Sequence, residues 1–396
     1  MKTVLISGVG IAGPTLAYWL KAAGFAPTLV ESAPALRSGG YVIDFWGLGY
    51  DIAERMGLLD KIHRVGYRVR EMRIVDDRGA RITGFRTRTF TELTGGRFVS
   101  LARSDLSRLL FDAAKDGTET IFDDEITDLR QEAGHVEVRF REAGQRQFDL
   151  VIGADGLHSA VRRLAFGPES RFEKNLGYAV AAFEVRGYRP RDEDVYVMYG
   201  RPGLMLGRFT QRDDRTLFLF VFSNDARELP SRLDLQKALL RDRYRDAKWE
   251  SPRVLDELEQ TPALYLDRVS QIRMGSWSQG RVALVGDAAF CVSLLAGQGS
   301  ALAMISAYVL AGELMRAGGR HEEAFAGYEA LLRPFISAKQ RGAEGFAGMF
   351  APRTGWGLQF RNYIIKAFAI PGLARLVIGR DIVDKLSLPA YDWPAA

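Results

Sequence analysis

The chain has few of the residues that mark disulfide-linked, zinc-binding and esterase-like proteins. Its 396 residues include one cysteine, Cys291, so no disulfide can form within the chain, as suits a reducing cytoplasm. No Cys or His pair has metal-ligand spacing, because the four histidines (His63, His135, His158 and His321) are far apart. The Gly-x-Ser-x-Gly motif of serine hydrolases is also missing. We therefore expect no metal site and no esterase activity.

A strong charge of one sign is missing too, with 54 Lys and Arg against 49 Asp and Glu. The basic residues are scattered among acidic ones, without a Lys/Arg-rich block or a recognition motif, so we expect no nucleic-acid partner. A mild attraction for an anionic substrate is the smaller inference. No basic segment with a cleavage site precedes the first apolar run, so we expect no signal peptide and a cytoplasmic protein.

The sequence also lacks an uninterrupted hydrophobic stretch long enough to span a membrane. Residues 288–312 carry no charge and are long enough to cross a bilayer, but the polar turn "GQGS" at residues 297–300 breaks them. An apolar strand ending at Asp287 precedes this stretch, so we expect a buried strand, a turn and a core helix, and no transmembrane segment. A second apolar stretch, residues 362–379, is expected to pack over the substrate lobe or against a second subunit in a homodimer. A position on a membrane surface is the alternative.

What the sequence does have begins at its first residues, "MKTVLISGVGIAGPTLAYWL". An apolar strand runs into Gly8, Gly10 and Gly13, a helix follows, and a second strand ends in Glu31. In this dinucleotide-binding pattern the glycines allow a tight turn, a close approach to a pyrophosphate and close helix packing. The expected phosphate contacts are the backbone from Gly8 to Gly13, including Ile11 and Ala12, and Glu31 is placed to accept from a ribose hydroxyl. Pro14 stands where a phosphate-binding loop of nucleoside triphosphatases needs Lys.

Two later segments repeat the combination of an apolar strand and a glycine turn. In "FDLVIGADGLHSAVRR" the strand ends at Asp155, where open α/β sheets bind ligands, although Ser159 as an N-cap of a plain turn explains it slightly better. In "GRVALVGDAAFCVSLLAGQGSALAMISAYVLAGEL" the strand runs into Asp287, and Gly297, Gln298, Gly299 and Ser300 then open a long helix. The positive end of that helix would face whatever lies beside the loop.

Together the three segments resemble the class A flavoprotein monooxygenases of the para-hydroxybenzoate hydroxylase type, including members that hydroxylate polyketides and antibiotics such as tetracyclines. Their marks are the first glycine motif, a mid-chain Asp-Gly, and a later Gly-Asp followed by Gly-x-Gly. "SLARSDLSRLL" places Arg103 on the family arginine that contacts FAD, and "ESAPALRSGGYVID" matches the loop that leads toward the flavin. The resemblance spans nearly the whole chain.

The resemblance implies bound FAD, with Asp287 on the ribityl chain and the backbone at Gly297–Gly299 near the flavin pyrimidine ring. NADPH or NADH would reduce the flavin. A flavin C4a-hydroperoxide formed with O₂ would then hydroxylate an aromatic, phenolic or polyketide-type small molecule. The sequence departs from the family at Phe290, where His is common, at Leu294, where Pro is common, and at Ser306, where an acid is common. The alternative is an FAD-dependent dehydrogenase or reductase. No residue stands out as a general acid or base.

The expected fold is α/β, with a Rossmann-like FAD-binding domain interwoven with a mostly antiparallel substrate sheet and a C-terminal helical region. The FAD-binding domain is expected at residues 1–68, 98–170 and 270–320, the substrate domain at 69–97 and 171–269, and the helical region at 321–396. Period-two alternation places Phe218, Phe220 and Phe222 on one face of a strand. The expected substrate-pocket residues are Met198, Met205, Phe209, Phe220 and Leu294.

Overall fold

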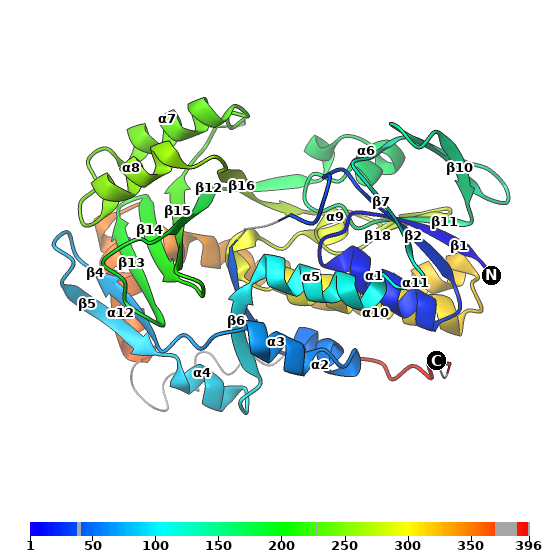
Figure 1. Cartoon of the computed structure of the whole chain (residues 1–396), viewed down its shortest axis with the longest axis horizontal. Helices are drawn as coiled ribbons and strands as arrows, with labels where there is room; N and C mark the ends of the chain where they lie inside the picture. Colours follow the sequence, from blue (N-terminus) through cyan, green and yellow to red (C-terminus); the bar gives the residue numbers. More distant parts are fainter. Residues whose placement is uncertain (38–40, 227, 369–385, 395–396) are drawn as a thin grey trace.

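The computed structural model describes residues 1–37, 41–226, 228–368 and 386–394, which form two lobes side by side (Figure 1). The first lobe contains a six-stranded sheet in the order β17-β18-β11-β1-β2-β7. All neighbours in it are parallel except β17 and β18. Its strands are β1 (Thr3–Ser7), β2 (Ala26–Glu31), β7 (Glu119–Phe122), β11 (Leu150–Gly153), β17 (Ser278–Gln279) and β18 (Val282–Leu284).

Helices and a small sheet enclose this parallel sheet. The central strands β11 and β18 are buried along their whole length, as expected for parallel strands covered on both faces. The helices α1 (Ala12–Ala22) and α10 (Gly299–Arg316) pack against each other, and α5 (Arg103–Ala114) packs on α1. Other elements of the lobe are α2 (Leu48–Arg55), α3 (Leu59–Val65), α6 (Ala160–Phe166), and the antiparallel strands β8 (Ile126–Gln131), β9 (Val136–Phe140) and β10 (Gln145–Phe148).

The second lobe contains a seven-stranded sheet in the order β16-β12-β15-β14-β13-β4-β5. Only the β13–β4 pair is parallel, so the expected antiparallel sheet is confirmed. The helices α7 (Leu233–Tyr244) and α8 (Ser251–Gln260) cover one face (Figure 1). Its strands are β4 (Glu71–Val75), β5 (Arg81–Arg86), β12 (Glu173–Arg186), β13 (Val195–Arg201), β14 (Leu204–Thr210), β15 (Arg215–Ser223) and β16 (Tyr265–Ile272).

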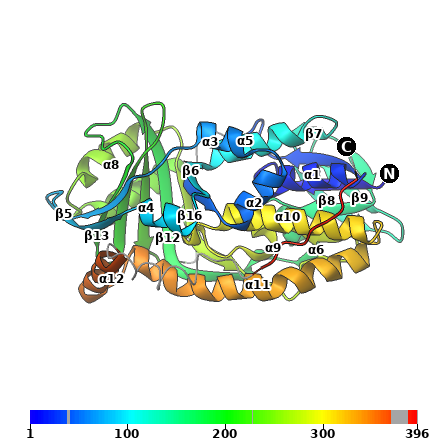
Figure 2. The same ribbon diagram turned by 90° about the horizontal axis from the view of Figure 1, so that it is seen from below.

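The chain crosses between the lobes several times, which confirms the interwoven α/β fold. Two antiparallel strands, β3 (Val42–Trp46) and β6 (Phe98–Ala102), precede and follow the excursion into β4, β5 and α4 (Arg88–Leu93). The long helix α11 (His321–Phe350) runs beneath both lobes, and α12 (Gly355–Phe368) lies under the seven-stranded sheet (Figure 2). The opposite face of the sheet from α7 and α8 therefore meets α12 and the end of α11.

The last part of the chain contains the expected C-terminal helical region, although the helices do not extend through its final described residues. The helices α11 and α12 are as expected, and α12 takes in the start of the apolar stretch at 362–379. Residues 369–385 lie outside the described residues. Residues 386–394 have no regular secondary structure, and their aromatic side chains pack instead on α1 and α10.

The charge-free stretch 288–312 is also settled by the fold. The strand β18 precedes it, and it divides into the short helix α9 (Asp287–Phe290), a 3₁₀ turn (Leu294–Ala296) and the buried helix α10. The expected strand, turn and core helix are therefore present, with α9 as an additional element. Within the described ranges, no helix combines the length and the hydropathy that crossing a membrane requires.

Candidate functional site

The first glycine motif forms a tight junction between β1 and α1. Gly8 has φ +105°, and a Cβ on it would lie 2.5 Å from the Ala154 carbonyl oxygen of the neighbouring strand connection. A Cβ on Gly13 would lie 1.9 Å from the Gly8 carbonyl oxygen, so only glycine lets the helix approach the loop this closely. No side chain caps the N-terminus of α1 within the described chain. Its first N–H groups are therefore available to an anion.

Glu31 is fastened to this glycine loop. Its Oε2 accepts a hydrogen bond from the Val9 backbone N–H at 2.9 Å, and its Oε1 accepts one from Ala33 N–H at 3.1 Å. Arg37 lies 3.4 Å from Oε1, and the Glu31 side chain is 12% exposed. The carboxylate thus orders the loop, a role that the sequence pattern did not indicate.

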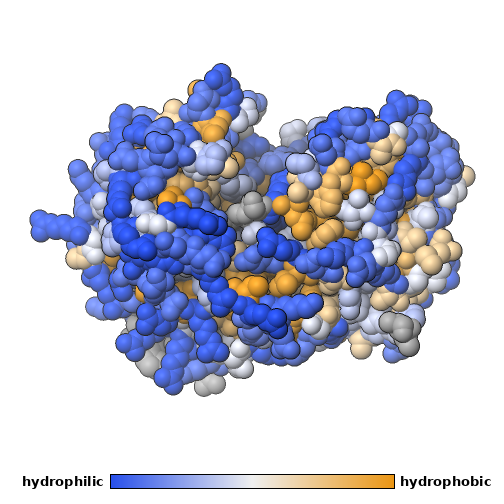
Figure 3. All heavy atoms as spheres, viewed as in Figure 1, coloured by the Kyte–Doolittle hydropathy of each residue, from blue (hydrophilic) through white to orange (hydrophobic). Residues whose placement is uncertain are grey.

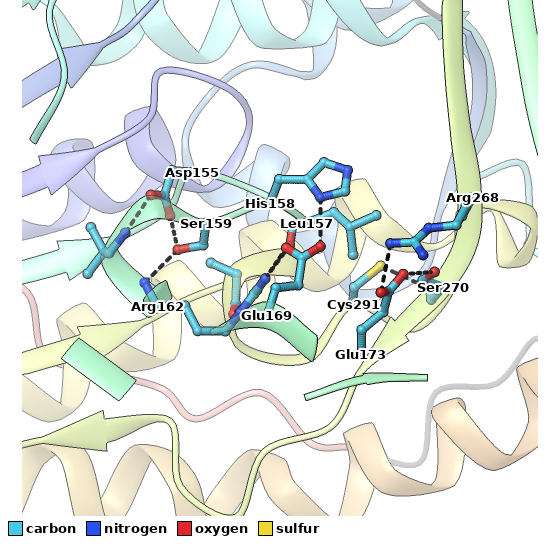
Figure 4. Close-up of polar contacts among 12 residues, drawn as sticks. Asp155, Leu157, His158, Ser159, Arg162, Glu169, Glu173, Arg268, Ser270 and Cys291 are labelled. Carbon is cyan, nitrogen blue, oxygen red and sulfur yellow. Dashed lines mark hydrogen bonds and ion pairs between the residues drawn. The ribbon is translucent and has the colours of Figure 1, made fainter. Parts of the chain in front are cut away.

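The second glycine motif is held together by its own helix (Figure 4). Ser159 caps α6, accepting from Arg162 N–H at 2.9 Å, as the sequence predicted. Asp155 accepts from the Ser159 hydroxyl and, at 3.1 Å, from Val161 N–H. Burial raises the pKa of the Asp155 carboxyl, and the hydrogen bonds from Ser159 and Val161 oppose that rise. Its carboxylate is therefore engaged by α6, and any contact it makes with a ligand is additional.

A buried arginine, which sequence reasoning missed, joins the second motif to the third. Arg162 is fully buried and donates to the Ala288 carbonyl oxygen at 2.9 Å and to Glu169 at 2.7 Å (Figure 4). Burial lowers the pKa of Arg162, and the Glu169 carboxylate opposes that shift. A charge without a partner would be costly at this depth, so Arg162 fixes where α9 lies relative to α6.

His158, from the same segment, links the two lobes. Its imidazole lies 2.9 Å from Glu169 and 3.1 Å from Asp267, which is on β16 of the seven-stranded sheet. Hydrogen bonds to these two carboxylates raise the pKa of His158 to about 10. The side chain is therefore a cation at neutral pH, and it acts as an ionic bridge between the lobes.

The third motif lies beside the first, since a Cβ on Gly286 would be 3.4 Å from the Ala12 Cβ. Asp287 begins α9, and a Cβ on Gly299 would lie 3.8 Å from its Oδ1, so the carboxylate faces the start of α10. Arg103 approaches from α5: its Nη2 would be 3.5 Å from a Cβ on Gly10. Burial raises the pKa of the Asp287 carboxyl, and the charge of Arg103 opposes that rise. Arg103 thus lies between the first glycine loop and Asp287.

Like the start of α1, the start of α10 has backbone N–H groups that no side chain caps among the described residues. Gly297 has φ +66°, and among the described residues no side chain caps α10, whose N-cap position is Gln298. Ser300 is in the first turn. Ser306, which stands where the family commonly has an acid, accepts from Gly286 N–H at 3.0 Å and so holds the turn before Asp287. Phe290 lies in the core, with its ring 4.7 Å from that of Trp277.

The structure separates the expected substrate-pocket residues into two groups. Met198 and Met205 lie on the sheet face that meets Leu295 and α12, and Leu294 packs against that cluster. Phe209 is on the same face by alternation with Met205, and its ring meets Tyr196 edge-on at 4.6 Å. Figure 3 shows apolar side chains reaching the surface between the two lobes.

Phe220 is the exception, because it lies on the other face of the sheet from Met198 and Met205. Its neighbours Phe218 and Phe222 do share its face, as predicted, but that face meets α7 and α8. The Phe220 ring lies 4.9 Å from the Tyr244 ring of α7. Period-two alternation identifies which residues share a face of a strand, but not which face meets the other lobe.

Comparison with known proteins identifies the family to which this arrangement of motifs belongs. The family model described as "FAD binding domain" matches residues 1–340. An uncharacterized protein of Mycobacterium tuberculosis is 41% identical, covering 86% of this chain and 92% of its own. A flavin-dependent monooxygenase of Legionella longbeachae is 35% identical, covering 85% of this chain and 87% of its own. This chain belongs to the FAD-binding family of flavin-dependent monooxygenases.

A solved structure supports the assignment of this chain to the FAD monooxygenases. The tetracycline destructase Tet(55) superposes with a TM-score of 0.85 at 32% identity, covering 99% of each chain. The residues present fit FAD by their own chemistry: two uncapped helix N-termini, a carboxylate at the end of β2 and a buried carboxylate beside Arg103. Among the described residues, no group of His, Cys, Asp and Glu side chains could hold a metal ion.

One further residue of the FAD monooxygenase lies at this site and was not singled out from the sequence. Asp44 lines a small pocket together with the polar turn Gly297, Gln298 and Ser300. Burial raises the pKa of its carboxyl, and Ser100, its cross-strand partner on β6, donates to it at 2.5 Å. The available signal was a lone acid inside the apolar strand "VIDFW", a position that a carboxylate rarely takes without a role.

Proposed function

We propose that this FAD monooxygenase uses NADPH or NADH and O₂ to hydroxylate an aromatic, phenolic or polyketide-type small molecule. The observation that carries this proposal is the position of Asp287, whose carboxylate faces the uncapped start of α10 while Arg103 joins it to the first glycine loop. When bound, FAD supplies the oxygen activation and transfer. The similarity to a tetracycline destructase supports a multi-ring phenolic substrate.

The chain's own residues would bind and orient the cofactor. The amides at the start of α1, from Gly10 to Gly13, would hold the pyrophosphate, and Glu31 would accept from the adenosine ribose. Asp287 would accept from the ribityl hydroxyls. The N-terminus of α10, at Gly297–Ser300, would stabilise negative charge on the flavin pyrimidine ring. Asp155 would contribute mainly by fixing the position of α6.

The apolar face of the seven-stranded sheet would supply the substrate pocket. Met198, Met205 and Phe209 come from neighbouring strands, and Leu294 comes from the turn before α10, so the two lobes share the pocket. Side chains without polar groups would exclude water from the reaction. Excluding water matters because the activated oxygen can either be transferred to the substrate or be lost to solvent.

Replacing Asp287 by alanine is expected to weaken FAD binding by about 10- to 150-fold. A hydrogen bond to a charged group contributes roughly 1.5–3 kcal/mol, and each 1.4 kcal/mol is tenfold in affinity. The fold should persist, because the variant removes a carboxylate whose burial already raises its pKa. A flavin titration of the apoprotein measures the change, with Asp128→Ala, a variant at an exposed ion pair, as the control. Unchanged affinity in Asp287→Ala would remove Asp287 from the proposed site.

Turnover under labelled oxygen tests the reaction itself. A true substrate should accelerate NAD(P)H oxidation and gain one oxygen atom, with the label arriving from ¹⁸O₂ and not from labelled water. Mass spectrometry of the product provides the measurement. Turnover that proceeds without O₂, with another electron acceptor and no oxygen inserted, would instead establish the dehydrogenase or reductase alternative.

A further inference from the structure

The helix α12 exposes three aromatic side chains on one face. Trp356, Phe360 and Tyr363 are 85%, 68% and 74% exposed, and their spacing of four and three residues places them in one row. The other exposed large apolar side chains of the described residues, Met1, Ile82, Leu235 and Tyr265, lie on different elements. Contiguous exposed apolar surface of this kind marks an interaction site in a soluble protein.

The opposite face of α12 packs on the protein through two buried side chains. Ile365 is buried in the cluster that contains Met198 and Met205. Arg361 is 5% exposed and donates to the Phe350 carbonyl oxygen at 3.1 Å. Figure 2 shows α12 at an outer corner beneath the seven-stranded sheet, so a flat surface could approach its outer side.

The area and the charge of this face indicate what covers it. At these exposures the three rings offer about 500 Å² in all, since an aromatic side chain buries roughly 150–250 Å². Two copies meeting through this face would bury about 1,000 Å², which is less than the ~1,200–2,000 Å² of a stable protein interface. Residues 351–368 contain no Asp or Glu, and of their three basic residues Arg361 is buried on the inner face and Arg353 pairs with Asp225 at 2.8 Å, so Lys366 supplies the positive charge of the outer face.

We propose that the outer face of α12, formed by Trp356, Phe360, Tyr363 and Lys366, docks on an anionic lipid surface. Tryptophan and tyrosine suit the boundary between lipid and water, because their rings are apolar and each carries a polar group. Lys366 is exposed on the same side of the helix and would face the lipid phosphates. The inner face of the same helix packs on the proposed substrate pocket, so docking would bring that pocket close to apolar compounds dissolved in the lipid.

Sedimentation of the FAD-loaded full chain with vesicles tests this docking. The probes are vesicles of phosphatidylcholine alone and of phosphatidylcholine with one quarter phosphatidylglycerol. The wild-type chain should sediment with the anionic vesicles, and Trp356→Ser/Phe360→Ser/Tyr363→Ser should weaken binding by at least about tenfold. Lys366→Ser should weaken it by about fivefold on anionic vesicles only. The matched control, Ile82→Ser/Leu235→Ser, replaces side chains that are 50% and 49% exposed elsewhere and should bind as wild type.

Three outcomes would overturn the proposal. The first is a wild-type chain that stays in the supernatant with both vesicle types. The second is a triple variant that sediments as well as wild type while keeping its FAD content and melting temperature. The third is a dimer in solution that the triple variant converts to monomer without any vesicle binding, which would show that a second copy covers α12.

Discussion

Gly10→Val is expected to yield a folded protein that purifies without FAD. A Cβ at Gly10 meets only Arg103 Nη2, at 3.5 Å, so the backbone tolerates a side chain in the absence of ligand. The added methyl groups would instead occupy the space in front of α1 where the pyrophosphate is proposed to lie. Losing two or more hydrogen bonds to a charged group, at roughly 1.5–3 kcal/mol each, lowers the affinity by more than about 100-fold. The ratio of flavin to protein absorbance after purification measures the loss.

Two other glycines show whether the effect belongs to this position. Gly134→Val should keep full flavin content, because a Cβ there meets no atom within 4 Å. Gly13→Ala should reduce the soluble yield and the melting temperature as well as the flavin content, because its Cβ would lie 1.9 Å from the Gly8 carbonyl oxygen. Stoichiometric flavin in Gly10→Val would show that the pyrophosphate does not bind at this loop.

Patterns within one segment of the chain predicted the local structure well. The glycine loop before α1, the Ser159 cap of α6 and the turn that opens α10 each depend on residues a few positions apart. Such structure follows from backbone conformations that only particular residues adopt, so the sequence states it directly. The order of the three motifs then indicated the family and, through it, the fold.

Contacts between distant segments were the part that the sequence did not indicate. Arg162 reads as an ordinary helical arginine, and only the fold places the Ala288 carbonyl group 126 residues later beside it. Asp44 meets the start of α10, about 250 residues away, in the same way. Phe220 was grouped with Met198 and Met205, although it lies on the other face of the sheet, because alternation does not distinguish the two sides.

The packing of the chain end on α1 and α10 was missed for the same reason, and it leads to a strong prediction. Trp393 lies 4.6 Å from Trp19 of α1, and the Tyr391 hydroxyl donates to Glu313 of α10 at 2.8 Å. Tyr308 and Arg55 both donate to the Pro389 carbonyl oxygen, at 2.9 and 3.1 Å. Residues 386–394 thus form a strap across the helices whose N-termini are proposed to hold FAD.

A chain ending at Lys385 should fold but melt about 4–7 °C lower than the full chain. Removing the strap exposes the surface that two aromatic side chains bury, at about 1.5–3 kcal/mol each, so the free energy of unfolding should fall by roughly 3–6 kcal/mol. For a chain of this length, an unfolding entropy of about 2.1 cal/mol/K per residue converts that loss into the stated shift. Scanning calorimetry of the flavin-loaded proteins measures it. An unchanged melting temperature would show that the strap contributes nothing to stability.

Gly312→Ala should lower the melting temperature of the full chain but raise that of the chain ending at Lys385. In the full chain a Cβ at Gly312 would lie 2.1 Å from the Tyr391 ring, so the alanine should push the strap away and lower the melting temperature. In the chain ending at Lys385 that ring is gone, and alanine in a helix interior is favoured over glycine by roughly 0.8–1 kcal/mol, so the same substitution should raise it. If Gly312 were crowded by neighbours other than the strap, the substitution would lower the melting temperature of both chains. Only direct contact between Gly312 and the strap produces opposite signs.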